Sequence, residues 1–144
     1  MGLLSKLFSN SNDARADAKD AGAALFGRTI VALESTVTIR KVLELSMADT
    51  GANTLTFATM AEFLDGLSSA APDIAILSVS DLKGNVFPFV EQIKSRFASA
   101  RIVLLTDMSN RIDLAAASQH GVDEVCMKPF NPVELLGTLT RLFQ

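Results

Sequence analysis

The chain is poor in the residues that stabilise small secreted domains or bind transition metals. Its 144 residues include one cysteine, one histidine, no tyrosine and no tryptophan. A single cysteine excludes a disulfide framework, and one histidine with one cysteine excludes a conventional zinc site. We therefore expect a protein of the reducing cytoplasm, with no metal and no cofactor.

The sequence also lacks an excess of basic residues and long apolar runs. Its formal net charge is −3, and no stripe of Lys and Arg stands out, which argues against nucleic-acid binding. No apolar run approaches the roughly 18 residues of a membrane-spanning helix, and the N-terminus lacks the pattern of a signal peptide. Hydrophobic residues make up 49% of the chain and charged residues 20%, which predicts one globular domain with a substantial core.

The later part of the chain alternates regularly between two patterns. Short β-branched apolar runs are followed by amphipathic stretches five times from residue 29 onward. The alternation predicts a flavodoxin-like α/β fold, a three-layer (βα)5 sandwich whose parallel sheet has the strand order 2-1-3-4-5. The fourth helix is expected around 112–119. The expected strands are 29–33, 54–58, 74–77, 101–105 and 123–127.

Ser78 ends the third expected strand, which begins at Ile74 after the turn at Pro72 and Asp73. In an open α/β sheet, ligands bind beyond the carboxyl ends of the strands. Any chemistry of this fold is therefore expected near Ser78. A glycine-rich phosphate loop and a nucleophile paired with a base are both missing, so we do not expect an enzyme. An unrelated flavodoxin-like enzyme stays open as an alternative, because a fold alone does not fix a function.

The first 27 residues differ in composition and are expected to form an extension of the domain at 28–144. Residues 9–27 are rich in Ser, Asn, Asp and Ala and predict a tether or a loosely packed helix that buries little. Residues 1–8 carry a compact apolar face formed by Leu3, Leu4, Leu7 and Phe8. This face could dock at a membrane surface or in a partner groove, or it could fold back on the domain.

The segment HGVDEVCMKPFNPVELL (120–136), the strand IVLLT that ends at Thr106, and the phrase PDIAIL together resemble response-regulator receiver domains. The resemblance covers nearly all of 28–143. It implies that Lys128 is the lysine that contacts the phosphoryl group, that the peptide bond before Pro129 is cis, and that Thr106 is the hydroxyl residue that senses phosphorylation.

Four positions depart from the receiver pattern. A receiver has two acids after its first strand and an aspartate that accepts the phosphoryl group, and together they hold Mg²⁺. This chain has Glu34, Ser35 and Ser78 at those places. One carboxylate holds Mg²⁺ weakly, and without the metal nothing offsets the charge of a transferring phosphoryl group. The aromatic switch residue of the fifth strand is replaced by Val125. The resemblance therefore implies a pseudo-receiver that lacks the phosphoacceptor aspartate.

Two hypotheses about function follow. In the leading one, the chain is a non-phosphorylatable module for protein contact, scaffolding or localisation in a signalling, motility or polarity system, and Lys128 forms an ion pair with Glu34. In the alternative, the chain is a response regulator that still accepts a phosphoryl group, through Asp81 or Glu34. A homodimer or a protein partner is expected at the fourth helix, fifth strand and fifth helix. The charged residues expected on that surface are Arg111, Asp123, Glu124 and Arg141.

Overall fold

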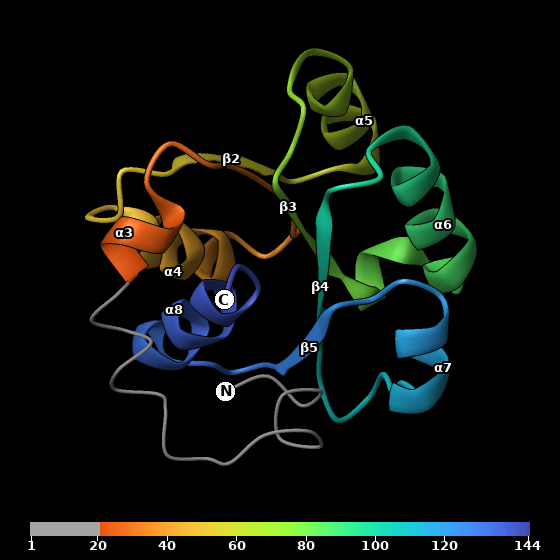
Figure 1. Ribbon diagram of the computed structural model, residues 1–144. Helices are drawn as coiled ribbons and strands as arrows, with labels where there is room; N and C mark the ends of the chain where they lie inside the picture. Colours follow the sequence, from red (N-terminus) through yellow and green to blue (C-terminus); the bar gives the residue numbers. More distant parts are fainter. Residues whose placement is uncertain (1–20) are drawn as a thin grey trace.

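The computed structural model describes residues 21–144 as alternating strands and helices around one sheet (Figure 1). The strands are β1 (Thr29–Leu33), β2 (Asn53–Phe57), β3 (Ile74–Ser78), β4 (Arg101–Thr106) and β5 (Glu124–Met127). The helices are α3 (Ala21–Leu25), α4 (Val37–Met47), α5 (Met60–Ser69), α6 (Val86–Arg96), α7 (Leu114–Gln119) and α8 (Pro132–Arg141), and a 3₁₀ turn, η2 (Val79–Leu82), follows β3.

The five strands form a parallel sheet in the order β2-β1-β3-β4-β5. The register brings the carboxyl ends of neighbouring strands together, since Leu33 pairs with Leu77, Ser78 with Leu105, and Thr106 with Met127. The predicted fold class and strand order are therefore confirmed.

Two apolar clusters fill the space on either side of the sheet. One lies under α5, α6 and α7 and includes Phe63, Phe89 and Val125. The other lies under α3, α4 and α8 and includes Leu43 and Leu135. The helices therefore cover both faces of the sheet as two outer layers (Figure 1). This double cover explains why the central strands read as continuous apolar runs.

Local sequence signals place the helix starts. The Thr59 side chain accepts a hydrogen bond from the Glu62 N–H at the start of α5. The Asn131 side chain does the same with the Glu134 N–H at the start of α8, where Pro132 occupies the first turn. These caps satisfy N–H groups that have no partner inside the helix.

The structure adds details that the sequence did not predict. The fourth helix begins at Leu114 rather than near residue 112, because the Asp113 side chain caps it by accepting from the Ala116 N–H. The Leu25 side chain of α3 is fully buried in the cluster with α8, so the end of the predicted extension packs against the domain. Leu3, Leu4, Leu7 and Phe8 lie outside the described residues, and the division at residue 27 stays a prediction.

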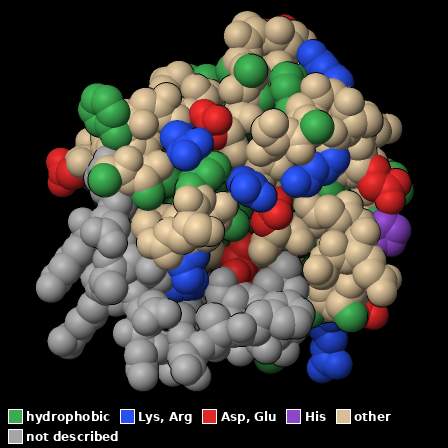
Figure 2. All heavy atoms as spheres, in the orientation of Figure 1, with side chains coloured by type: hydrophobic (Ala, Val, Ile, Leu, Met, Phe, Trp, Pro, Cys, Tyr) green, Lys and Arg blue, Asp and Glu red, His purple; other side chains and the backbone are tan. Residues whose placement is uncertain are grey.

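The described surface mixes charges of both signs. In Figure 2, Lys and Arg side chains lie beside Asp and Glu side chains, without a continuous basic area on the face shown. Among the described residues, no helix has the length and apolar character needed to cross a membrane.

Candidate functional site

Four of the predicted site residues meet at the carboxyl edge of the sheet. Glu34 directly follows β1, Ser78 ends β3, Thr106 ends β4 and Lys128 directly follows β5. The parallel register brings these strand ends side by side. The peptide bond between Lys128 and Pro129 is cis.

A buried ion pair joins β1 to β5. The Lys128 Nζ lies 2.6 Å from the Glu34 Oε1, and the two side chains are 11% and 1% exposed. The second carboxylate oxygen, Oε2, accepts a hydrogen bond from the Thr36 N–H at 3.0 Å. The ion pair predicted between Lys128 and Glu34 is therefore present, and it neutralises a carboxylate that has almost no contact with solvent.

The same lysine reaches β3. Its Nζ donates a hydrogen bond to the Ser78 Oγ at 3.0 Å, and Ser78 is completely buried. The Ser78 hydroxyl also lies 3.2 Å from the Ser80 hydroxyl. Lys128 thus bridges the ends of β1, β3 and β5. The Nζ of Lys128 is the donor in its contact with Ser78 and lies against the Glu34 carboxylate, so it is not placed as a base toward the serine.

A second carboxylate enters the site from η2. The Asp81 Oδ2 accepts a hydrogen bond from the Ser35 N–H at 2.9 Å. Partial burial by itself raises the pKa of the Asp81 carboxyl, but hydrogen bonds from Ser35 and Ser78 and the charge of Lys128 together hold that pKa below its ordinary value. Asp81 is therefore ionised at neutral pH and belongs to the site.

The sequence analysis named Asp81 only as an unorthodox phosphoacceptor. The signal that could have found its contact with Ser35 is its spacing. In a 3₁₀ turn, side chains three residues apart lie above one another, and because η2 begins directly after Ser78, Asp81 lies over Ser78 at the strand end. Lys83 then adopts a left-handed conformation with φ 50°, which ends the turn before Gly84.

Thr106 is engaged with its own loop. Its hydroxyl donates a hydrogen bond to the Asn110 carbonyl oxygen. The Asp107 carboxylate accepts from the Ser109 N–H at 2.9 Å and from the Asn110 side chain at 3.0 Å. The Asn110 side chain and the Ser109 N–H lower the pKa of the Asp107 carboxyl. The loop after β4 therefore has its own set of hydrogen bonds, separate from the Lys128 bridge.

The donor set does not fit the magnesium ion of a receiver. Within the described part of the chain, no group of three or more His, Cys, Asp or Glu residues is placed to hold a metal. Of the two carboxylates in the site, Glu34 is neutralised by Lys128 and Asp81 is held by the Ser35 N–H. Magnesium prefers several oxygen ligands in a near-octahedral array. We therefore derive no metal-dependent step for this site.

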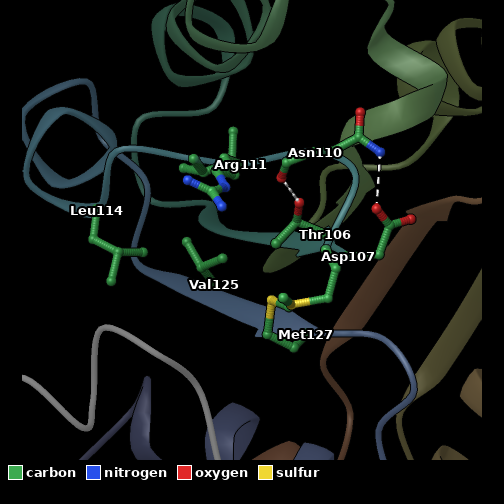
Figure 3. A pocket seen from close by; sticks show the side chains of 9 residues that line it. Thr106, Asp107, Asn110, Arg111, Leu114, Val125 and Met127 are labelled. Carbon is green, nitrogen blue, oxygen red and sulfur yellow. Dashed lines mark hydrogen bonds between the residues drawn. The ribbon is translucent and has the colours of Figure 1, made fainter.

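Val125 lies beside this site, at the floor of a surface pocket of about 230 Å³ (Figure 3). Its side chain is fully buried and packs in the cluster under α5, α6 and α7. Leu114 and Met127 form part of the apolar wall, and Arg111 reaches over the same hollow.

The charged residues predicted to share one interaction surface do not cluster. Glu124 is only 2% exposed and accepts a hydrogen bond from the neighbouring N–H of Val125. The prediction that Glu124 contributes to an exposed surface is therefore wrong. Asp123 precedes β5 at the amino edge of the sheet, where it accepts from the Ile102 N–H at 2.8 Å and pairs with Lys94.

The other two residues of that prediction stay candidates. Arg111 is exposed in the loop after β4, at the carboxyl edge of the sheet. Arg141 is half-buried in the last turn of α8. Because α8 runs back along the sheet from the carboxyl end of β5, Arg141 lies toward the opposite edge from Arg111. A contact surface that includes both Arg111 and Arg141 would have to extend from the carboxyl edge of the sheet to its amino edge.

Comparisons with known proteins identify the architecture. No protein-family model matches the chain. A crystal structure of a response regulator from Thermotoga maritima superposes with a TM-score of 0.72 at 15% identity, covering 82% of this chain and 98% of that one. The chemotaxis response regulator CheY4 of Vibrio cholerae superposes with a TM-score of 0.70 at 26% identity, covering 81% and 98%. The chain has a receiver-domain fold.

Similarity in sequence points to the same group of proteins. The Regulator of RpoS of Escherichia coli is 26% identical over 112 residues, which are 78% of this chain and 33% of the relative. The Transcriptional regulatory protein GltR of Pseudomonas aeruginosa is 29% identical over 120 residues, which are 82% of this chain and 50% of the relative. The chain thus spans between a third and a half of the length of these two relatives. The similarity to response regulators supports a signalling role for this receiver fold.

Proposed function

We propose that the chain is a pseudo-receiver that acts through protein contact and does not depend on phosphorylation. The observation that carries this proposal is the position of Lys128, which is paired with Glu34 at 2.6 Å and donates to Ser78 at 3.0 Å. The group that would bind a phosphoryl oxygen is already used inside the protein. The buried hydroxyl of Ser78 stands where a phosphoacceptor would need a carboxylate.

The charges in the site argue in the same direction. A phosphoryl group adds about −1.5 to −2 charge at neutral pH. It would arrive beside the carboxylates of Glu34 and Asp81. The two cations that the described residues place in contact with the site are already engaged, since Lys128 is paired with Glu34 and Arg40 donates to the carbonyl oxygens of Glu34 and Ser35. Like charges at short range in a partly desolvated site oppose one another strongly. Binding of a phosphoryl group is therefore expected to be unfavourable unless another cation enters.

The proposal is tested by an amide NMR spectrum of the full chain before and after Mg²⁺ and beryllofluoride, a phosphoryl mimic. We expect no shift at Glu34, Ser78, Thr106 or Lys128. A matched control is the triple variant Glu34→Asp, Ser35→Asp and Ser78→Asp, which restores three carboxylates at the sheet edge. Shifts in the variant alone support the proposal, whereas saturable shifts in the wild-type protein contradict it.

The position of Asp81 supports a second candidate function, in which the chain accepts a phosphoryl group. The Asp81 carboxylate reaches the same site, and its lowered pKa keeps it ionised. In this candidate the chain is a response regulator that accepts a phosphoryl group on Asp81 or Glu34. Intact-protein mass spectrometry after incubation with acetyl phosphate tests it. A gain of one phosphoryl group that Asp81→Asn or Glu34→Gln removes would establish the second function.

Partners and location belong to the same proposal. A homodimer or protein partner at α7, β5 and α8 is tested by sedimentation equilibrium of the wild-type chain against Arg111→Gln, and equal monomer masses for both contradict the homodimer.

We propose a cytoplasmic module whose residues 1–8 bind a membrane or a partner. Liposome co-sedimentation of the full chain against one that begins at Ser11 tests the membrane contact, and equal pelleting contradicts it.

A further inference from the structure

The pocket above Val125 combines an apolar interior with one exposed cation. It lies between the loop after β4 and the face of β5 and has a volume of about 230 Å³. Val125, Leu114, Ile112 and Met127 supply its apolar wall. Figure 3 shows Val125, Leu114 and Met127 around a hollow that opens beside the Arg111 guanidinium. The pocket is separate from the Lys128 bridge, because neither Glu34 nor Ser78 lines it.

The size of the pocket selects its occupant. Sites for drug-sized ligands have volumes of about 300–1,000 Å³, and an apolar cavity of about 150 Å³ accepts one benzene ring. A pocket of about 230 Å³ therefore fits one aromatic ring with a short substituent. A single Phe or Tyr side chain has this size, and a larger cofactor does not.

The charge beside the pocket indicates which group should accompany the aromatic ring of the ligand. Among the described residues, no carboxylate lies within ion-pair distance of Arg111. The Asp107 carboxylate accepts from the Ser109 N–H and the Asn110 side chain. Figure 3 shows Asp107 turned away from Val125, whereas Arg111 reaches over it. A carboxylate carried next to the ring would therefore meet Arg111.

The rim of the pocket points to a macromolecular partner. Met108 lines the pocket and is 80% exposed, so an apolar side chain stands in water at its edge. Methionine side chains adapt to different apolar surfaces and are frequent in protein-binding sites. A ligand that only filled the hollow would leave Met108 in solvent, whereas a polypeptide that lies across the rim would cover it.

We propose that this pocket binds one aromatic side chain of a partner protein, with an adjacent acidic residue that pairs with Arg111. Aromatic side chains that fill small pockets supply a large share of the binding energy at protein interfaces. The inference rests on the proposed function, because it names the contact through which a phosphorylation-independent module would recognise its partner.

The first experiment uses small probes on the full chain. N-acetyl-L-phenylalanine carries a ring and a carboxylate, and its amide carries the same ring without the charge. Methyl NMR spectra are recorded with each probe up to about 20 mM, because a molecule of this size is expected to bind in the millimolar range. We expect the methyl resonances of Val125, Leu114 and Ile112 to shift, with the acid binding about two- to fivefold more tightly than the amide.

Variants assign the contacts. Arg111→Gln is expected to remove the difference between acid and amide, whereas the control Arg96→Gln, at a separate groove beside α6, leaves it unchanged. Val125→Phe fills the hollow from within and is expected to abolish binding of both probes. If that variant loses its dispersed spectrum, Leu114→Phe narrows the same pocket from its wall. Absence of shifts, shifts centred on the groove beside α6, or unchanged binding by a folded filled variant would overturn the proposal.

A second experiment identifies the source of the ring. A phage-displayed heptapeptide library is selected on the wild-type chain, with counter-selection on Val125→Phe. Enrichment of an aromatic residue next to Asp or Glu supports a protein partner. Probe binding without such enrichment overturns that assignment and points to a free aromatic acid. The proposed function fails separately, through a response to beryllofluoride, since none of these probes carries a phosphoryl group.

Discussion

The bridge at Lys128 predicts an asymmetric effect of removing its two charges. Lys128→Met leaves the Glu34 carboxylate, whose side chain is 1% exposed, with the Thr36 N–H as its remaining described hydrogen-bond partner. Breaking a buried ion pair by removing one partner costs about 3–5 kcal/mol. Glu34→Gln leaves Lys128, which is 11% exposed, can extend its flexible stem toward solvent and still donates to Ser78. We expect the glutamine variant to lose about 1–2 kcal/mol, the range of one lost charged hydrogen bond.

The double variant, Glu34→Gln with Lys128→Met, distinguishes the energy of the ion pair from the effect of losing each side chain. Removing both charges leaves no unpaired ion, so we expect Glu34→Gln with Lys128→Met to be more stable than Lys128→Met alone. The difference between the double variant and the sum of the single variants measures the coupling energy. We expect a coupling of about 2 kcal/mol, since neighbouring charged groups in one network usually couple by about 0.5–3 kcal/mol.

The assay is urea unfolding at neutral pH, followed by far-ultraviolet circular dichroism because the chain has no tryptophan or tyrosine to report by fluorescence. For a domain of this size, the loss in Lys128→Met corresponds to a decrease in melting temperature of about 10–17 °C. If Glu34→Gln destabilises the protein more than Lys128→Met, or if both cost less than about 0.5 kcal/mol, the bridge is not a buried ion pair that stabilises the fold.

Three further predictions concern single residues. Because the folded pKa of Asp81 is lowered, Asp81→Asn should lose stability, by no more than about 1 kcal/mol for this partly exposed group, above the unfolded pKa of about 3.9. The loss should fade as pH falls through the folded pKa, as measured by urea unfolding at pH 7 and pH 3. Burial raises the pKa of the Cys126 thiol to about 12, so its thiolate fraction at pH 8 is about a thousandfold below that of an ordinary thiol, and a chromogenic disulfide reagent should label it only after unfolding. Gly66→Ala would place a Cβ 2.3 Å from the Phe57 ring; we expect calorimetry to show a loss of about 1–3 kcal/mol, where alanine in an open helix would add about 1 kcal/mol.

The architecture could be predicted because its signals are local and periodic. The strand 29–33 reads TIVAL in the sequence, and β1 has the same bounds. The strand order follows from the alternation of strands and helices, since right-handed crossovers leave few alternatives. The start of α7 was missed because the pattern at Ile112 continues an apolar stripe, whereas the Asp113 cap decides where the helix begins.

The site could be predicted only in part, because its contacts join distant parts of the chain. The pairing of Lys128 with Glu34 followed from the resemblance, since the family brings these positions together. The hydrogen bond between Asp81 and Ser35, 46 residues apart, depends on a 3₁₀ turn that leaves no periodic signal. Glu124 was misplaced because a glutamate in a short strand predicts an exposed side chain, whereas the structure buries it.

If the chain is a pseudo-receiver, as we propose, Lys128 has a different role from the lysine of a phosphorylated receiver. Its ammonium then needs partners within the protein, because a buried unpaired ammonium would destabilise the fold. Its contacts with Glu34 and Ser78 offset the free-energy cost of burying the ammonium, and they connect the end of β5 to the ends of β1 and β3. The loop after β4 stays outside this bridge, because Thr106 bonds to Asn110. The carboxyl edge of the sheet therefore has a part that is joined by the Lys128 bridge and a separate pocket, which is the contact that we propose for a partner.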